Sequence, residues 1–318
     1  MTKENSSADN QEASLAPQAV EDKPPAPHGQ ARRAMKPAVT AQQSASCPTC
    51  AGGAEGENGS YSYVYCLGRI RPQFPNLSVE KEFAQATGRT DTAGLTDAKV
   101  LHKFLTDHEY RYLARQMCWV FSVEGHECYL VQPADPTMLD TLCHCVRENP
   151  TDEDIDVLVG VKGPLAPPEM CNGLVLPIVA ADQVWSFNRK MLLDALQYPG
   201  EKKPTEEQKK QFKESAGDIL EKVADNPGDN DEQRAVNYLV VRSQEVYSLA
   251  WENLQQGRSL TGIETTPSRL SGSRNLVGVV FTFTDRKTGV VSQYYVRVDV
   301  TEEFPFLVSK PAPTFERP

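Results

Sequence analysis

The first 46 residues of this 318-residue chain contain no phenylalanine, tryptophan or tyrosine. They are rich in alanine, glutamine, serine and proline, so they bury too little apolar surface to offset the entropy lost on folding. We therefore predict that residues 1–46 form a disordered tail. The N-terminus also lacks the apolar core of a signal peptide, and no apolar run is long enough to span a membrane. These absences predict a cytoplasmic protein with no membrane partner.

Positive charge is scarce relative to negative charge. The chain has 33 lysines and arginines against 43 aspartates and glutamates, which gives a formal net charge of -10. An excess of negative charge argues against a general affinity for nucleic acid, so we expect no nucleic-acid partner. The 39% hydrophobic and 24% charged content is ordinary for a soluble globular protein.

Motifs of common enzyme classes are also absent. The sequence has no G-x-G-x-x-G, no phosphate-binding loop, no G-x-S-x-G and no H-E-x-x-H. It has five histidines, and only His144, between Cys143 and Cys145, is a candidate metal ligand. A nucleophile paired with a general base is therefore not recognisable, and we expect no autonomous hydrolase activity.

Apolar periodicity divides the chain after about Tyr61 into strands and helices. Period-two alternation over 116–133 predicts a hairpin that turns at Gly125 and His126, with Trp119, Phe121 and Val123 on one face. Helix-like periodicity predicts one long helix over 231–255, and the acidic residues after Val300 are typical of a solvated helix start. The remaining predicted helices cover 78–87, 96–107, 135–148 and 204–226, and the remaining strands cover 62–70, 154–163, 173–187, 259–269, 275–285 and 290–300.

Strands and helices occur in clusters and not in strict alternation, which favours an α+β fold with mixed or antiparallel sheets and packed helices. We predict one domain over residues 47–310, preceded by the disordered tail and followed by a C-terminal tail, 311–318.

Eight cysteines remain to be explained. In a reducing compartment they should be thiols or metal ligands and not disulfides. Cys47 and Cys50 form a C-x-x-C pair, which supplies two ligands to a tetrahedral zinc ion from one tight turn. A redox pair of the thioredoxin type would open a helix after a strand, whereas this pair follows the tail. The pair therefore predicts half of a structural zinc site.

The other two ligands are not determined by spacing. Cys143 and Cys145 lie about 200° apart on a predicted helix and so cannot share a metal. Cysteines in predicted strands are most often small buried hydrophobes. Cys171 lies in the constrained loop "PPEMCNG", where a side chain can be aimed. The strand cysteines are Cys66, Cys118 and Cys128.

Several segments together resemble a known family. They are "YVYCLGRIRPQFPNLSVEKEFAQATGR", "RYLARQMCWVFSVEG", "GVKGPLAPPEMCNGL", "SLTGIETTPSRLSGSRN" and "RVDVTEEFPFLV". They resemble the C-terminal accessory domain of PatG- and PatA-type cyanobactin maturation proteases. In that family the domain is appended to a subtilisin-like protease and is regarded as a zinc-bearing module of unassigned function. The resemblance implies that Cys118 and Cys171 join Cys47 and Cys50 in a structural Zn²⁺ site.

The resemblance also implies a functional context. The chain has no Ser-His-Asp signature and no room for a protease domain, so the protease activity of the family is not expected here. We expect a non-catalytic, zinc-stabilised accessory protein of cyanobactin-like peptide biosynthesis, which binds a precursor peptide or a peptide-modifying enzyme. The alternative is a zinc- or cysteine-dependent enzyme that acts on peptides.

Overall fold

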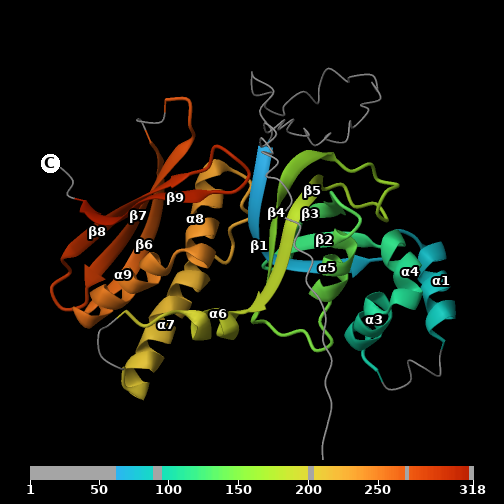
Figure 1. Cartoon of the computed structure of the whole chain (residues 1–318), viewed down its shortest axis with the longest axis horizontal. Coiled ribbons are helices and arrows are strands. Elements are labelled where there is room, and N and C mark those ends of the chain that lie inside the picture. The colour runs from blue at the N-terminus through green and yellow to red at the C-terminus, as the bar shows by residue number, and fades with distance from the viewer. Residues whose placement is uncertain (1–61, 89–94, 200–203, 269–271, 315–318) are drawn as a thin grey trace, which may run out of the picture. The chain divides into compact units, whose positions relative to one another are not determined.

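The computed structural model describes residues 62–88, 95–199, 204–268 and 272–314 (Figure 1). The predicted disordered tail and the predicted ligands Cys47 and Cys50 lie outside these ranges. The described residues contain a closed barrel and a second, four-stranded sheet. The prediction of an α+β fold with mixed and antiparallel sheets is confirmed. None of the described helices is both long and apolar enough to cross a membrane.

Five strands close the barrel in the order β1-β2-β3-β5-β4. All neighbours are antiparallel except β3 and β5, which are parallel. The first strand changes partner between Gly68 and Arg69: its first half pairs with β4 and its second half with β2. This order is that of the OB-fold, a five-stranded Greek-key barrel. The strands are β1 (Ser62–Gln73), β2 (Cys118–Val123), β3 (His126–Pro133), β4 (Asp154–Leu165) and β5 (Pro177–Asn188).

Helices extend the barrel interior into a larger core. Inward-facing Trp119 and Phe121 belong to one apolar cluster with the helical residues Phe104, Leu113 and Leu142. The prediction that Trp119, Phe121 and Val123 share one face is confirmed. Between β1 and β2 lie α1 (Leu77–Thr87), α3 (Asp97–Thr106), the short 3₁₀ helix η1 (His108–Tyr110) and α4 (Arg111–Gln116), and between β3 and β4 lies α5 (Met138–Cys145).

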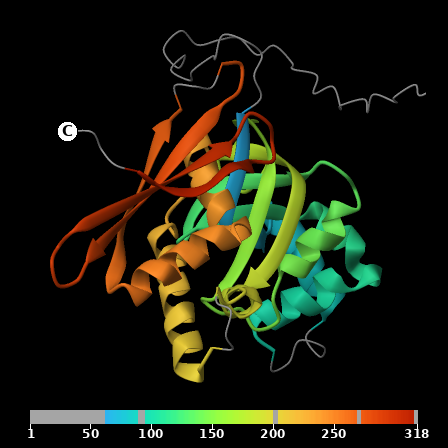
Figure 2. The same ribbon diagram turned by 60° about the vertical axis from the view of Figure 1, so that its left-hand side comes forward.

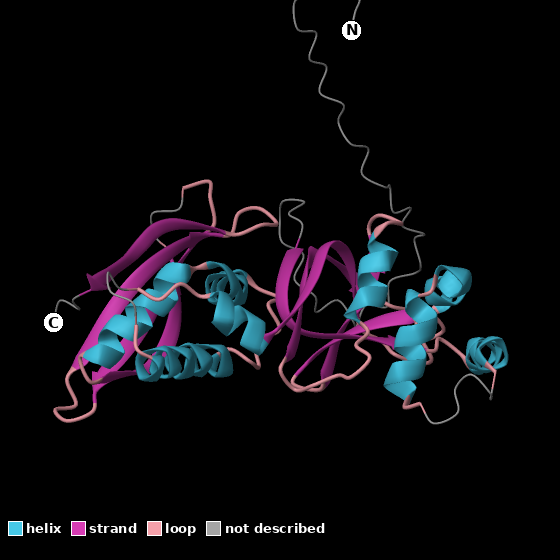
Figure 3. Ribbon diagram, turned by 60° about the horizontal axis from the view of Figure 1, so that its bottom comes forward, coloured by secondary structure: helices cyan, strands magenta, loops and turns pink. Residues whose placement is uncertain are grey.

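The second half of the chain packs helices against an antiparallel sheet of order β6-β7-β8-β9 (Figure 2). Alternate residues of β7, from Val277 to Phe283, face α7, α8 and α9 in one apolar cluster. The helices gather on one side of this sheet (Figure 3). The elements are α6 (Arg189–Ala195), α7 (Glu206–Lys222), α8 (Asp231–Arg242), α9 (Gln244–Gln255), β6 (Arg258–Pro267), β7 (Leu276–Asp285), β8 (Val291–Asp299) and β9 (Phe306–Thr314).

A loop from the second half covers an open edge of the barrel. Since β1 pairs with β2 only from Arg69 onward, the backbone of Tyr65 has no strand partner on that side. Gly228 accepts a hydrogen bond from the Tyr65 amide at 3.1 Å, and Asn237 of α8 donates to the Tyr65 carbonyl at 2.8 Å. The hydroxyl of Tyr129, on β3, donates to the carbonyl of Pro227 at 3.2 Å. The loop therefore covers the gap between β1 and β3.

Local sequence signals place the starts of α1, α3, α7 and α8 within two residues, whereas α4 and α6 have no counterpart among the predicted helices. The capping box of Thr205 and Gln208 is present at the start of α7. The first helix, however, begins at Leu77, one residue earlier than predicted, because Asn76 is its N-cap and accepts from the amides of Ser78 and Val79. The hairpin likewise turns at Glu124 and Gly125, one residue before the predicted position.

The predicted helix over 231–255 is two helices. Ser243 has extended backbone angles, φ -98 and ψ 102, and separates α8 from α9. This break lets α8 contact β1 while α9 packs along β6. The acidic stretch after Val300 leads not into a helix but into β9. That strand runs to Thr314, so regular structure continues past Lys310, where the predicted domain ends.

Candidate functional site

Cys118 and Cys171 are brought together by the barrel. Cys118 is the first residue of β2, and its side chain lies on the outer face of the barrel, opposite to Trp119. Cys171 lies in the loop 166–176 between β4 and β5 and is completely buried. The two are joined in a disulfide with their Cα atoms 6.1 Å apart, across 53 residues of sequence. The expectation that no cysteine forms a disulfide is therefore wrong for this pair.

The loop that carries Cys171 is held by backbone hydrogen bonds. Ala166 donates to Leu176 across its base, and Leu174 donates to Cys171, both at 2.8 Å. Asn172 donates to the carbonyl of Pro75 at 2.9 Å, which ties the loop to the end of β1. Apolar side chains of the loop pack on Val120 and Leu130 of the barrel wall. The position of the Cys171 sulfur is thus fixed by the fold around it.

The donor set fits half of a tetrahedral zinc site. Two thiolates bound to one zinc at about 2.3 Å have their sulfurs roughly 3.8 Å apart, and cysteines with adjacent Cα atoms reach this separation once the disulfide is reduced. Cys47 and Cys50 lie outside the described residues, so the four predicted ligands are not seen together. Within the described ranges, no three histidine, cysteine, aspartate or glutamate side chains are placed to hold a metal ion.

The four free cysteines of the described chain have other surroundings. Cys143 and Cys145 point in different directions, as the helical spacing predicts: Arg111 donates to the Cys143 sulfur at 3.0 Å, and Ser186 contacts the Cys145 sulfur at 3.3 Å. Burial raises the pKa of Cys145 to about 12 and also raises the pKa of Cys66. Cys128 is half-buried. Raised pKa values keep these thiols protonated, which suits packing and not nucleophilic attack.

His144 does not take part in a cluster of metal ligands. Its side chain is exposed, and its Nδ1 lies 2.6 Å from the carbonyl oxygen of Asp140 in the preceding turn of α5. The structure thus places this histidine on the surface, outside any group of three or more possible metal ligands among the described residues.

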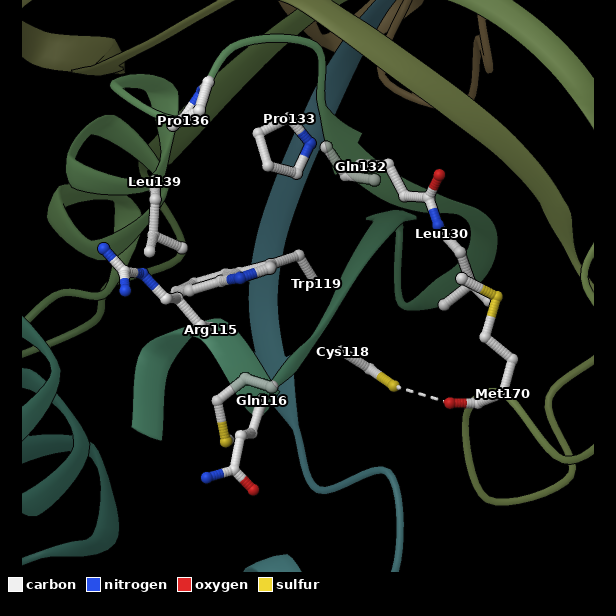
Figure 4. A pocket seen from close by; sticks show the side chains of 12 residues that line it. Arg115, Gln116, Cys118, Trp119, Leu130, Gln132, Pro133, Pro136, Leu139 and Met170 are labelled. Atoms are coloured by element: carbon white, nitrogen blue, oxygen red, sulfur yellow. Dashed lines mark hydrogen bonds between the residues drawn. The ribbon is translucent and has the colours of Figure 1, made fainter. Parts of the chain in front are cut away.

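A groove of about 540 Å³ lies beside Cys118, where β2 begins and β3 ends (Figure 4). Its floor is apolar, because Trp119, Leu130 and Leu139 each expose less than a tenth of their surface. Figure 4 shows Trp119 between Arg115 on one side and Leu130 with Met170 on the other. Sequence reasoning places Trp119 in the core but does not find the groove. Its other lining residues are Gln116, Met117, Cys118, Val131, Gln132, Pro133 and Pro136.

The groove and the disulfide share one loop. The Cys118 sulfur lies 3.6 Å from the carbonyl oxygen of Met170, and the Met170 side chain lines the groove next to Leu130 (Figure 4). The interactions that fix Cys171 in the loop 166–176 therefore also fix Met170, which forms one wall of the groove.

Comparison with known proteins gives two family matches in series. Residues 63–165 match the family described as "PatG Domain", and residues 206–313 match the family described as "PatG C-terminal". A solved structure, "PatG Domain of Unknown Function", is similar at a TM-score of 0.63 and 20% sequence identity, and the match covers 80% of this chain and 99% of that chain. At this identity the similarity shows the fold alone. No curated protein matches the chain.

The two matches correspond to the two parts of the fold. The first covers the barrel strands β1 to β4, and the second covers α7 to β9. The fold thus defines an OB-type barrel followed by a helix-backed antiparallel sheet. The chain therefore contains a PatG domain and a PatG C-terminal domain, as the sequence resemblance predicts. These are PatG-associated domains of cyanobactin maturation proteins, and their function is unknown.

Proposed function

We propose that this chain is a zinc-stapled, non-catalytic accessory protein of cyanobactin-like peptide biosynthesis, and that it binds a precursor peptide or a peptide-modifying enzyme. The observation that carries the proposal is the presence of both PatG-associated domains in one chain. The raised pKa values of Cys66 and Cys145 disfavour the alternative of a cysteine-dependent enzyme that uses either thiol as its nucleophile.

The proposed staple is a Zn²⁺ ion held by Cys47, Cys50, Cys118 and Cys171. Four thiolates fill the coordination sphere of a structural zinc, which leaves no position for substrate. The barrel supplies two of these cysteines side by side. A zinc ion on all four would attach the segment before β1 to the strand β2 and to the loop 166–176.

Chain length allows this attachment within one molecule. Gln73, at the end of β1, pairs with Cys118, so Cys50 must reach back along the whole of β1. A straight strand of 12 residues would span about 36 Å. The eleven residues between Cys50 and Ser62 extend up to about 40 Å. Since β1 bends around the barrel, the distance to be bridged is shorter than the straight strand (Figure 1).

We expect the full chain, purified under reducing conditions, to contain one equivalent of zinc. Cys47→Ser, Cys118→Ser and Cys171→Ser should each lose the zinc, because a site left with three thiolates binds zinc more weakly than the closed site with four. Cys128→Ser, which removes a half-buried free thiol, is the matched control and should keep the metal. Metal analysis by mass spectrometry of the desalted proteins measures this.

Oxidation provides a second readout of the same site. A cysteine side chain binds zinc as the thiolate, so oxidation of Cys118 and Cys171 to the disulfide should release the metal in proportion to the disulfide formed. Zinc that remains bound in Cys118→Ser or Cys171→Ser would refute this ligand set, and so would a reduced wild-type protein free of zinc.

The accessory role is tested separately, with the tagged full chain in native cell extract. We expect a precursor peptide or a peptide-modifying enzyme among the captured proteins, identified by mass spectrometry against an untagged control. Recovery of neither, or robust cleavage of peptides by the pure protein, would contradict the proposal.

A further inference from the structure

The groove beside Cys118 has an exposed arginine at its rim. Arg115, in the last turn of α4, is exposed, and no ion pair or hydrogen bond joins its guanidinium to another of the described residues. Arg111, four residues earlier on the same helix, is by contrast paired with Asp140. The exposed amides of Gln116 and Gln132 lie on the same rim. The groove thus combines an apolar floor with one available positive charge and two available amides.

We propose that this groove binds an extended segment of an acidic peptide, with apolar side chains over Trp119 and a carboxylate on Arg115. The inference rests on the proposed peptide-binding function and assigns it a place. A volume of about 540 Å³ lies within the range of small-ligand sites, so it accommodates a few side chains and not a whole domain. The rim amides of Gln116 and Gln132 can hydrogen-bond the peptide backbone between those side chains.

The position of the groove agrees with the fold. OB-folds bind their ligands on strands 2 and 3 and on the loops between strands 1 and 2 and between strands 4 and 5. Here the groove is lined by β2 and β3, by Arg115 from the β1–β2 connection and by Met170 from the β4–β5 connection. The ligand class, however, follows from the side chains and not from the fold.

Those side chains favour peptide over nucleic acid. Single-stranded nucleic acid needs a positive channel and exposed aromatic rings on which bases stack. Trp119 is only 4% exposed, and Arg115 is the single cation of the lining. An apolar floor with one arginine at its rim instead complements apolar side chains that alternate with carboxylates.

The test measures binding of a short fluorescein-labelled peptide of alternating leucine and glutamate by fluorescence anisotropy. The full zinc-loaded chain should bind it, and should bind the same peptide with lysine for glutamate, or serine for leucine, on the order of tenfold more weakly. Arg115→Glu should reverse the charge preference. Arg71→Glu, an equal charge change at an exposed arginine outside the groove, is the matched control and should leave binding unchanged.

The outcomes distinguish an error in the groove assignment from an error in the proposed peptide-binding function. Peptide binding that is indifferent to Arg115→Glu overturns the groove assignment and leaves a peptide-binding function in place elsewhere. Failure of the wild-type chain to bind any of the three peptides overturns the groove and counts against peptide binding itself. Photo-crosslinking from p-benzoylphenylalanine at Gln132 adds a third readout: crosslinks to the added peptide support the proposal, and crosslinks to residues 1–61 of the same chain overturn it in favour of an internal occupant.

Discussion

Gly228→Ala is expected to lower the free energy of unfolding by at least about 3 kcal/mol, a value near the upper end for single substitutions. An added Cβ at this position would lie 2.0 Å from the carbonyl oxygen of Tyr65 and 2.9 Å from Nδ2 of Asn237. Both groups take part in the hydrogen bonds that cover the open edge of β1, so neither can move without losing a bond. The residue also has φ +66, which costs about 1–2 kcal/mol for alanine by itself.

Gly257→Ala separates the two contributions. Gly257 also has a positive φ, +79, but nothing lies within 4 Å of its added Cβ. This control should therefore lose only about 1–2 kcal/mol from the backbone conformation. Urea unfolding followed by circular dichroism measures both variants. A Gly228→Ala protein no less stable than Gly257→Ala would show that the loop does not press against β1 as described.

The same variant reports on how the two family domains are coupled. Gly228 lies in the segment that matches the PatG C-terminal family, and Tyr65 lies in the segment that matches the PatG domain. If the two segments unfold as one cooperative unit, Gly228→Ala should shift a single transition to lower urea. Two separate transitions would instead show that each segment is stable without the other.

Local structure could be predicted from this sequence because its signals are local. The alternation of Trp119, Phe121 and Val123 is a property of one strand, and the capping box at Thr205 needs only four residues. The closure of the barrel could not be predicted in this way. It depends on pairings such as Tyr65 with Val159 and Leu130 with Ile178, and any apolar strand is a possible partner for another.

The candidate site shows the same division. The C-x-x-C spacing of Cys47 and Cys50 indicates a metal knuckle, but only the family resemblance indicated Cys118 and Cys171 as partners. Their proximity arises because β2 and the β4–β5 loop meet on one barrel wall. The groove had no sequence signal at all, since Arg115 and Met170 come from different connections and become neighbours only in the closed barrel.

Arg234→Met is expected to cost about 3–5 kcal/mol, because it removes four hydrogen bonds donated by a buried guanidinium, each worth on the order of 1 kcal/mol. Arg234 is 1% exposed, and its guanidinium donates to the carbonyl oxygens of Val300, Glu302 and Glu303 and to the carboxylate of Asp231. Methionine has a similar length and fills most of the space, but it donates no hydrogen bond. Three carbonyl groups and one carboxylate would therefore lose their partner in a partly buried region, where each unsatisfied group is costly.

The location of these carbonyls makes the effect more than local. Residues 300–303 form the turn between β8 and β9, and the guanidinium also lies 5.3 Å from the ring of Tyr63 on β1. One side chain of α8 thus holds both the last strand of the second sheet and the first strand of the barrel. Its loss should expose β9 first, which hydrogen exchange of residues 306–314 would reveal as faster exchange at urea concentrations well below the unfolding midpoint.

Arg242→Met is the matched control, because it removes the same group from the same helix. Arg242 lies 4.8 Å above the ring of Trp185 and is exposed, so this change should cost only about 0.5–1 kcal/mol. Equal destabilisation by the two substitutions would contradict the role assigned to Arg234. It would mean that losing the buried hydrogen bonds of Arg234 costs no more than losing the contact of Arg242 with Trp185. A large loss in Arg234→Met alone, together with faster exchange in β9, would establish that the β8–β9 turn is anchored through this one guanidinium.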